Sequence, residues 1–76
     1  MEVFLNDNIK YLRALKKIPQ KKLADLIGIN RSTISRIENG EIETTIENAY
    51  KLALYFDISL EDLITKNLRQ SGKFDK

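Results

Sequence analysis

Apolar residues recur at three- and four-residue spacing along most of the chain, and no run alternates between apolar and polar positions as a half-buried strand does. The pattern predicts an all-α fold in which five short helices form one compact domain over residues 1–67. After about Asn67 the periodicity is lost, so residues 68–76 are predicted to be a frayed C-terminal tail. No repeat, low-complexity tract or Gly/Ser linker divides the chain.

Local signals place the ends of the first two helices. The first helix is predicted to begin at a cap among Asn6–Asn8 and to end before Pro19, because the residue before a proline avoids the α region. The second begins at Gln20 and ends at Gly28, which suits the left-handed position after a helix. The apolar positions that these two helices are expected to bury are Ile9, Leu12, Leu15, Leu23, Ala24 and Ile27.

Only three residues, 28–30, separate the second helix from the third. Asn30 is a strong N-cap for a helix over about Arg31–Asn39, which Gly40 then ends. Two short helices joined by a three-residue turn that contains Gly form the helix-turn-helix unit. The spacing therefore predicts a helix-turn-helix over residues 20–39.

Capping boxes predict where the last two helices start. Thr44 is followed three residues later by Glu47, and Ser59 is followed at the same distance by Asp62, which replaces the usual Glu. The apolar positions of these helices are Ala49, Leu52, Ala53 and Phe56 in the fourth and Leu60, Leu63 and Ile64 in the fifth.

The third helix is predicted to turn a face without acids toward solvent. At about 100° per residue, Ile34 and Ile37 point inward and small or hydrogen-bonding side chains point outward, whereas an ordinary solvated face in a chain this rich in Glu would be expected to carry an acid. Such a face suits the major groove of DNA, and the planar fork of Arg36 matches guanine O6 and N7. The short side chains of Ser32, Thr33 and Ser35 can bond to bases or phosphate, and Arg31 in the first turn can reach a base or the backbone.

The net charge of +2 conceals an uneven distribution along the chain. Residues 10–36 carry eight Lys and Arg against one Asp, a net charge of +7, whereas residues 37–65 carry one Lys against seven acids, a net charge of −6. The asymmetry indicates a face that meets a polyanion, although solvated helix faces that merely differ would give the same numbers. Gln20, Lys21 and Lys22 gather at the start of the second helix, whose free N–H groups and positive dipole favour a phosphate.

Composition excludes several kinds of chemistry. The chain has no Cys and no His, so it offers no disulfide, thiol nucleophile, imidazole base or usual zinc ligand set, and we expect no metal or cofactor. An enzyme is the weakest candidate function, because only carboxylates could act and 76 helical residues leave little room for a cleft. The longest apolar run, Leu52–Phe56, is far short of a membrane span, and no signal peptide is visible, so an intracellular domain is expected.

The stretch from Gln20 to Gly40 carries Gln-x-x-Leu-Ala at its start, a Gly in the turn and Ile-Ser-x-Ile-Glu-Asn-Gly at its end. It resembles the phage-repressor and Cro type (XRE-like) of helix-turn-helix domain, and the pattern continues as far as Leu63, so it covers about residues 8–65. The resemblance implies a lambda-repressor-like fold and a sequence-specific, double-stranded DNA-binding transcriptional regulator, of the repressor kind. Such a protein is expected in the cytoplasm, associated with the nucleoid, in a bacterium or phage.

The resemblance also implies roles for individual residues. Arg13 and Glu38 are implied to form a partly buried ion pair between the first and third helices, and the sequence supports this because Glu38 falls on the inward side, where an unpaired carboxylate would be costly. Glu38 is thus given a structural role and not a catalytic one. The resemblance assigns base reading and nearby backbone contacts to Arg31, Ser32, Thr33, Ser35 and Arg36. The residues predicted to contact phosphate are Gln20, Lys21, Lys22, Asn39 and Gly40.

Four positions depart from the family pattern, all in loops. Pro19 stands where a Ser or Thr is usual, Lys17 and Asp57 where Gly is usual, and Thr44 where Pro is common. Lys17 implies either a lysine in the left-handed region, which costs about 1–2 kcal/mol, or a shifted turn. None of the four lies on the predicted reading face.

The small DNA-reading surface of one domain indicates that the protein works with a partner. One such domain reads too few base pairs to find a genomic site, so a homodimer on a palindromic operator with half-sites about 34 Å apart is expected. Leu63, Ile64 and Leu68 are candidates for the dimer contact, or else they only close the core. The alternative function is a protein-interaction module, such as an antitoxin or adaptor, whose partner docks on the acidic second half or on the Met1–Leu5 extension.

Overall fold

The computed structural model describes residues 3–71, and within them every regular element is a helix. The helices are α1 (Leu5–Lys16), α2 (Gln20–Ile27), α3 (Arg31–Glu38), α4 (Ile46–Tyr55), α5 (Leu60–Thr65) and α6 (Leu68–Ser71). The all-α prediction is therefore confirmed, with one more helix than the sequence pattern predicts. None of these helices is long and apolar enough to span a bilayer.

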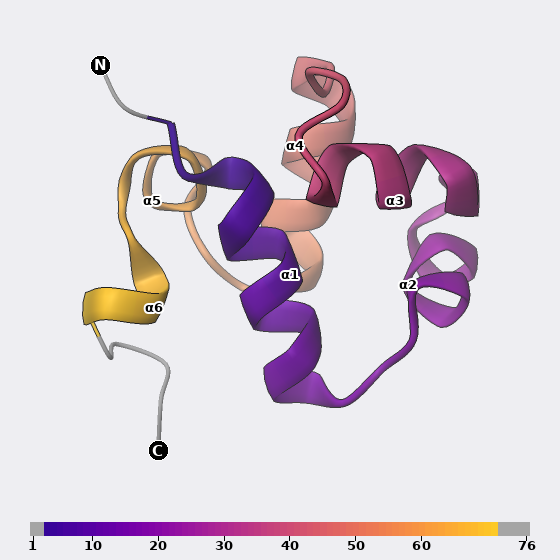
Figure 1. Cartoon of the computed structure of the whole chain (residues 1–76), viewed down its shortest axis with the longest axis horizontal. Coiled ribbons are helices and arrows are strands. Elements are labelled where there is room, and N and C mark those ends of the chain that lie inside the picture. Colours follow the sequence, from indigo (N-terminus) through magenta and orange to yellow (C-terminus); the bar gives the residue numbers. More distant parts are fainter. Residues whose placement is uncertain (1–2, 72–76) are drawn as a thin grey trace.

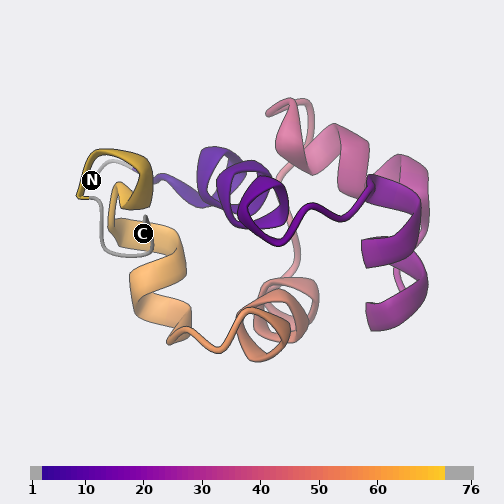
Figure 2. The same cartoon turned by 90° about the horizontal axis from the view of Figure 1, so that it is seen from below.

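Helix α1 runs through the middle of the molecule (Figure 1). Helices α2 and α3 lie on one side of it and α5 and α6 on the other, while α4 lies behind α1 and opposite it in the second view (Figure 2). Side chains from all six helices meet in one core, and the apolar ones with no exposed surface are Ile9, Leu23, Ile34, Ile37, Leu52, Leu63 and Leu68. The helix-turn-helix is thus held against α1 by apolar burial.

Most of the predicted helix ends agree with the structure to within a residue. Asn30 caps α3 by accepting from the Ser32 N–H at 2.9 Å, and Ser59 caps α5 by accepting from the Asp62 N–H at 3.0 Å. The cap of α4 is Thr45 and not Thr44, because Thr45 accepts from the Asn48 N–H. Glu47 consequently lies in the first turn but does not complete the predicted capping box.

Two expectations for α1 are wrong. The helix begins at Leu5, and Phe4 at its N-cap position makes no side-chain capping bond, so the predicted cap among Asn6–Asn8 is not used. Leu15, predicted to be buried, is 39% exposed. It lies in the last turn of α1, where the helix extends beyond the core.

Asn8 is fully buried and joins the two ends of the chain. Its Nδ2 donates to the carbonyls of Leu63 at 2.7 Å and Lys66 at 2.6 Å, and its Oδ1 accepts from the Leu68 N–H at 3.2 Å. The asparagine therefore satisfies the end of α5 and the start of α6, groups that have no partner within their own helices.

The predicted fraying of the tail is wrong for its first residues. Leu68–Ser71 form α6, which packs against α1, and Leu68 has no exposed surface. Arg69 adds an ion pair to Asp7 at 3.1 Å and lies 4.8 Å from the centre of the Tyr11 ring. Residues 72–76, the rest of the predicted tail, are outside the described residues.

Two turns use non-glycine residues in the left-handed region. Lys17 ends α1 at φ 57°, and Asp57 follows α4 at φ 56°. Of the two possibilities for Lys17, the structure shows the left-handed lysine and not a shifted turn. Its N–H donates to the Ala14 carbonyl at 3.0 Å, so the conformation is held by a helix-ending hydrogen bond.

Replacing Lys17 with glycine should stabilise the protein. Glycine adopts this backbone conformation without a Cβ clash, so the Lys17→Gly variant is expected to gain about 0.5–1 kcal/mol of unfolding free energy. Urea denaturation measures the change. The matched control is Lys16→Gly, one residue earlier and inside the helix, which should lose about 1 kcal/mol. Equal effects at the two positions would contradict the assignment of strain to Lys17.

Candidate nucleic-acid interface

The turn between α2 and α3 is built as its sequence predicts. Gly28 has φ 72°, the Ile29 N–H donates to the Ala24 carbonyl at 3.0 Å, and Asn30 opens α3. Leu23 and Ile34 are both fully buried, so each helix of the pair presents its apolar face to the core. The opposite face of α3 is left to solvent.

The five predicted base-reading residues lie on α3 but differ in exposure. Arg31, Ser32 and Arg36 are exposed, whereas Thr33 and Ser35 are half-buried. The Ser32 hydroxyl donates to Asn30 Oδ1 at 2.7 Å, in addition to the backbone cap. Its proton is therefore occupied, and toward a ligand Ser32 is available as an acceptor.

The predicted ion pair between Arg13 and Glu38 is present and buried on the glutamate side. Arg13 Nε lies 2.7 Å from Glu38 Oε2, and Nη2 donates to Oε1 at 3.0 Å, while the Glu38 side chain is 1% exposed. The remaining Nη1 donates to the Ile18 carbonyl. The hydrogen bond to Glu38 raises the pKa of Arg13 above its ordinary value, so the guanidinium stays charged.

Gln20 is a second partner of the same carboxylate, and this contact was not predicted from the sequence. Its Nε2 donates to Glu38 Oε1 at 3.0 Å, so the first residue of α2 is fixed to the last residue of α3. An amide carries a second N–H and a carbonyl oxygen, and this bond uses only one N–H. The signal available in the sequence was the inward position of Glu38, which a single arginine does not saturate.

Donors gather where the starts of α2 and α3 approach each other. A shallow hollow of about 520 Å³ is lined by Arg13, Pro19, Gln20, Lys21 and Arg31. Lys21 and Lys22 are exposed, and Lys21 Nζ forms an ion pair with Asp25 Oδ2, one turn later, at 3.3 Å. The structure thus brings Gln20, Lys21 and Arg31 together into one site whose N–H groups suit an anion.

At the other end of α3 an acid lies beside the predicted phosphate contact. Asn39 Nδ2 donates to Glu41 Oε2 at 3.4 Å, and both side chains are exposed. Gly40 adopts φ 73°, and its N–H donates to the Ile37 carbonyl at 3.1 Å. The Gly40 N–H is therefore already used, and a ligand would meet the Asn39 amide and the chain around Gly40 together with a carboxylate.

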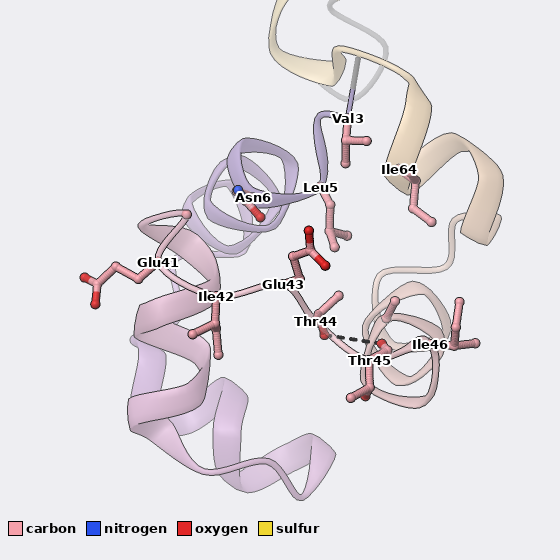
Figure 3. A pocket seen from close by; sticks show the side chains of 12 residues that line it. Val3, Leu5, Asn6, Glu41, Ile42, Glu43, Thr44, Thr45, Ile46 and Ile64 are labelled. Carbon is pink, nitrogen blue, oxygen red and sulfur yellow. Dashed lines mark hydrogen bonds between the residues drawn. The ribbon is translucent and has the colours of Figure 1, made fainter. Parts of the chain in front are cut away.

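A second hollow lies between the start of α1, the loop from α3 to α4, and α5 (Figure 3). Its walls include Val3, Leu5 and Ile64, and the Glu43 carboxylate points toward them. This is the region where the sequence analysis places a protein partner. No group of acidic side chains in the described part of the chain could hold a metal ion.

The predicted dimer contact is wrong for two of its three residues. Leu63 and Leu68 are fully buried in the core of the single chain, so neither can contact a second copy. Ile64 is half-buried at the wall of the second hollow. The leucines close the core, which is the other possibility that the sequence leaves open.

Comparisons with known proteins agree with this geometry. A family model described as helix-turn-helix matches residues 9–63. An uncharacterized HTH-type transcriptional regulator of Methanocaldococcus jannaschii is 36% identical over 59 residues, which are 78% of this chain and 89% of that protein. The antitoxin PezA of Streptococcus pneumoniae is 32% identical over 60 residues, 79% of this chain but 38% of its own length.

Among solved structures, the restriction-modification controller protein C.AhdI from Aeromonas hydrophila superposes with a TM-score of 0.72 at 32% identity. The match covers 78% of this chain and 89% of that protein. The similarity therefore extends over nearly the whole of a small regulator.

Proposed function

Because this chain belongs to the helix-turn-helix family of DNA-binding transcriptional regulators, we propose that it represses transcription by binding a palindromic operator as a homodimer. Members of this family are regulators and not enzymes. In the proposal α3 enters the major groove and the start of α2 contacts the phosphate backbone. Repression needs nothing beyond occupancy of an operator that overlaps a promoter.

One observation carries the proposal. Helix α3 contains a single acid, Glu38, and its carboxylate is buried and bonded to Arg13 and Gln20. The charges that α3 presents to solvent are consequently the two arginines, Arg31 and Arg36. A helix with this face can approach the phosphates of a groove without like-charge repulsion.

The residues divide into two proposed classes. Arg36, in the last turn of α3, is assigned to base reading, with the exposed Ser32 beside it as an acceptor for an amino group. Phosphate contacts are assigned to the residues that line or adjoin the shallow hollow at the starts of α2 and α3, namely Gln20, Lys21, Lys22 and Arg31. Arg31 is also assigned a possible contact with a base. Thr33 and Ser35 are half-buried and Asn39 faces Glu41, so we expect smaller contributions from them.

The Arg36→Ala variant tests the assignment. It is expected to lose base preference at one position of each half-site, at a cost of about 1–3 kcal/mol. Selection of bound sequences from random DNA at physiological salt, with wild type and variant, measures the preference together with operator symmetry and half-site spacing.

Lys22→Ala is the matched control. It should weaken binding to all sequences alike and reduce the salt slope by about one unit. Uniform weakening by Arg36→Ala would make Arg36 a phosphate contact, and an asymmetric selected site would contradict the palindrome. Transcription from a promoter that carries the selected site then distinguishes repression from activation.

A protein-interaction module remains the second candidate function. It is supported by the 32% identity with an antitoxin and by the second hollow, where Glu43 faces apolar walls. The purified chain separates the two functions. Sequence-selective DNA binding without any added protein supports the regulator, whereas DNA binding only with a partner present supports the module.

A further inference from the structure

Helix α4 carries an uncovered apolar stripe on the side that faces away from the core. Ile46 is 73% exposed, Tyr50 55% and Leu54 63%. They stand at i, i+4 and i+8 and therefore lie along one face of the helix. Three of the seven large apolar side chains that are exposed in the described residues belong to this stripe.

The stripe is distinct from the face that holds α4 in the fold. Ala49, Leu52 and Ala53 are the buried residues of this helix. In Figure 3 Ile46 projects from α4 at the edge of the second hollow, away from Leu5 and Glu43, so the first residue of the stripe also borders that hollow. Single exposed apolar residues need no explanation, but an aligned set of large ones indicates a contact surface.

The stripe is symmetric about its central residue. At about 100° per residue, Ile46 and Leu54 lie about 40° to either side of Tyr50 and about 6 Å from it along the axis. If a second α4 packs antiparallel with Tyr50 on the two-fold axis, Ile46 of each copy meets Leu54 of the other. The same patch then covers itself, as a two-fold interface requires.

Charges beside the stripe fit only the antiparallel arrangement. Glu47 and Lys51 lie on the same flank and already approach to 3.8 Å within the helix. In an antiparallel pair that flank faces its own copy, with Glu47 of one helix about 3 Å along the axis from Lys51 of the other. In a parallel pair the flank would face the opposite side of the partner helix, and these charges would not meet.

We propose that a second copy of this chain covers the stripe, through antiparallel pairing of α4 about Tyr50. The inference rests on the proposed homodimer and names its surface, in place of the buried Leu63 and Leu68. Three apolar side chains and two charges per chain make a small interface, below the size of stable dimers. Dimerisation is therefore weak in free solution and is strengthened when both copies sit on adjacent half-sites.

Cysteine cross-linking tests the pairing directly, because the chain has no cysteine of its own. Under mild oxidation Tyr50→Cys should give covalent dimers, and a mixture of Ile46→Cys with Leu54→Cys should give mixed dimers. Ile46→Cys or Leu54→Cys alone should give few, because each residue and its own copy lie about 12 Å apart along the axis, beyond disulfide reach. Efficient self-linking of both would show parallel pairing and overturn the proposal.

A charge reversal supplies an independent measurement. Glu47→Lys should raise the dimer dissociation constant in sedimentation equilibrium, and the Glu47→Lys/Lys51→Glu double variant should restore it. Leu54→Glu should raise it at least tenfold, whereas Leu26→Glu, at a leucine of similar exposure on α2, should not. A dissociation constant unchanged by Leu54→Glu would contradict the surface.

The outcome for this surface and the outcome for the proposed function are separable. Leu54→Glu should leave binding to a single half-site unchanged and weaken binding to the full site. A wild type that dimerises through α4 but selects no DNA sequence would overturn the function and leave the surface standing. If the wild type binds a palindrome and the Leu54→Glu variant binds it equally well, the proposed surface is overturned and the proposed function stands.

Discussion

An Arg13→Met variant should lose about 3–5 kcal/mol of unfolding free energy, because it leaves the Glu38 carboxylate buried without its counter-charge. Methionine preserves much of the apolar stem of the arginine, so the loss reports the charge and its hydrogen bonds and not the packing. A domain of this size is stable by about 5 kcal/mol or little more. We therefore expect the variant to retain no more than about 2 kcal/mol of stability and to be partly unfolded at 37 °C. Urea denaturation followed by circular dichroism measures the change.

Two further variants identify the cause of that loss. Lys10→Met removes an exposed cation from the same helix and should change stability by less than about 0.5 kcal/mol. Arg13→Met/Glu38→Met removes both charges and should recover much of the lost stability, because an apolar pair of similar volume replaces a buried ion pair at little cost. If the double variant is no more stable than Arg13→Met, the unpaired Glu38 carboxylate is not the cause of the lost unfolding free energy.

Asn8→Ala is expected to lose about 3 kcal/mol or more. The substitution removes the hydrogen bonds of Asn8 to the carbonyls of Leu63 and Lys66 and from the N–H of Leu68, and a buried carbonyl that loses its partner costs about 1–3 kcal/mol. Amide hydrogen exchange supplies a local readout. Protection of the Leu68 N–H should fall by more than the global stability requires, since the first residue of α6 loses its hydrogen bond to Asn8 of α1.

Asn6→Ala is the control for Asn8→Ala. It changes the same residue type in the same helix, and the Asn6 side chain makes no hydrogen bond within residues 3–71, so a loss below about 1 kcal/mol is expected. Asn8→Asp separates donors from shape, because it keeps the size of the side chain but turns an acceptor toward two carbonyls. Stability of Asn8→Asp near that of the wild type would contradict the role assigned to the Nδ2 hydrogen bonds.

The local signals of the sequence were sufficient for the helix-turn-helix. Gly28 and Asn30 carry their own backbone and capping preferences, so the turn and the start of α3 could be placed without knowing the fold. The inward position of Glu38 was likewise visible from helical spacing. Its pairing with Arg13 came from the family resemblance, and its bond to Gln20 from the structure alone.

Long-range contacts decided what could not be predicted. An asparagine near the start of a helix looks the same whether it caps that helix or binds another, and Asn8 reaches residues 55 and more positions away. Leu68 lies beyond the last residues that show the three- and four-residue apolar spacing. Its burial depends on the packing of α6 against α1. The buried residues of α4 were predicted from spacing, whereas its second, exposed apolar row, Ile46, Tyr50 and Leu54, was not.

The bond between Gln20 and Glu38 has a consequence for how the protein meets its ligand. A buried carboxylate holds the glutamine amide in one orientation in the free protein. Ordering a side chain of this length at an interface costs about 0.5–1.5 kcal/mol of entropy, and here that cost is incurred during folding. In the proposed DNA complex Gln20 would therefore need no further ordering when the phosphate arrives.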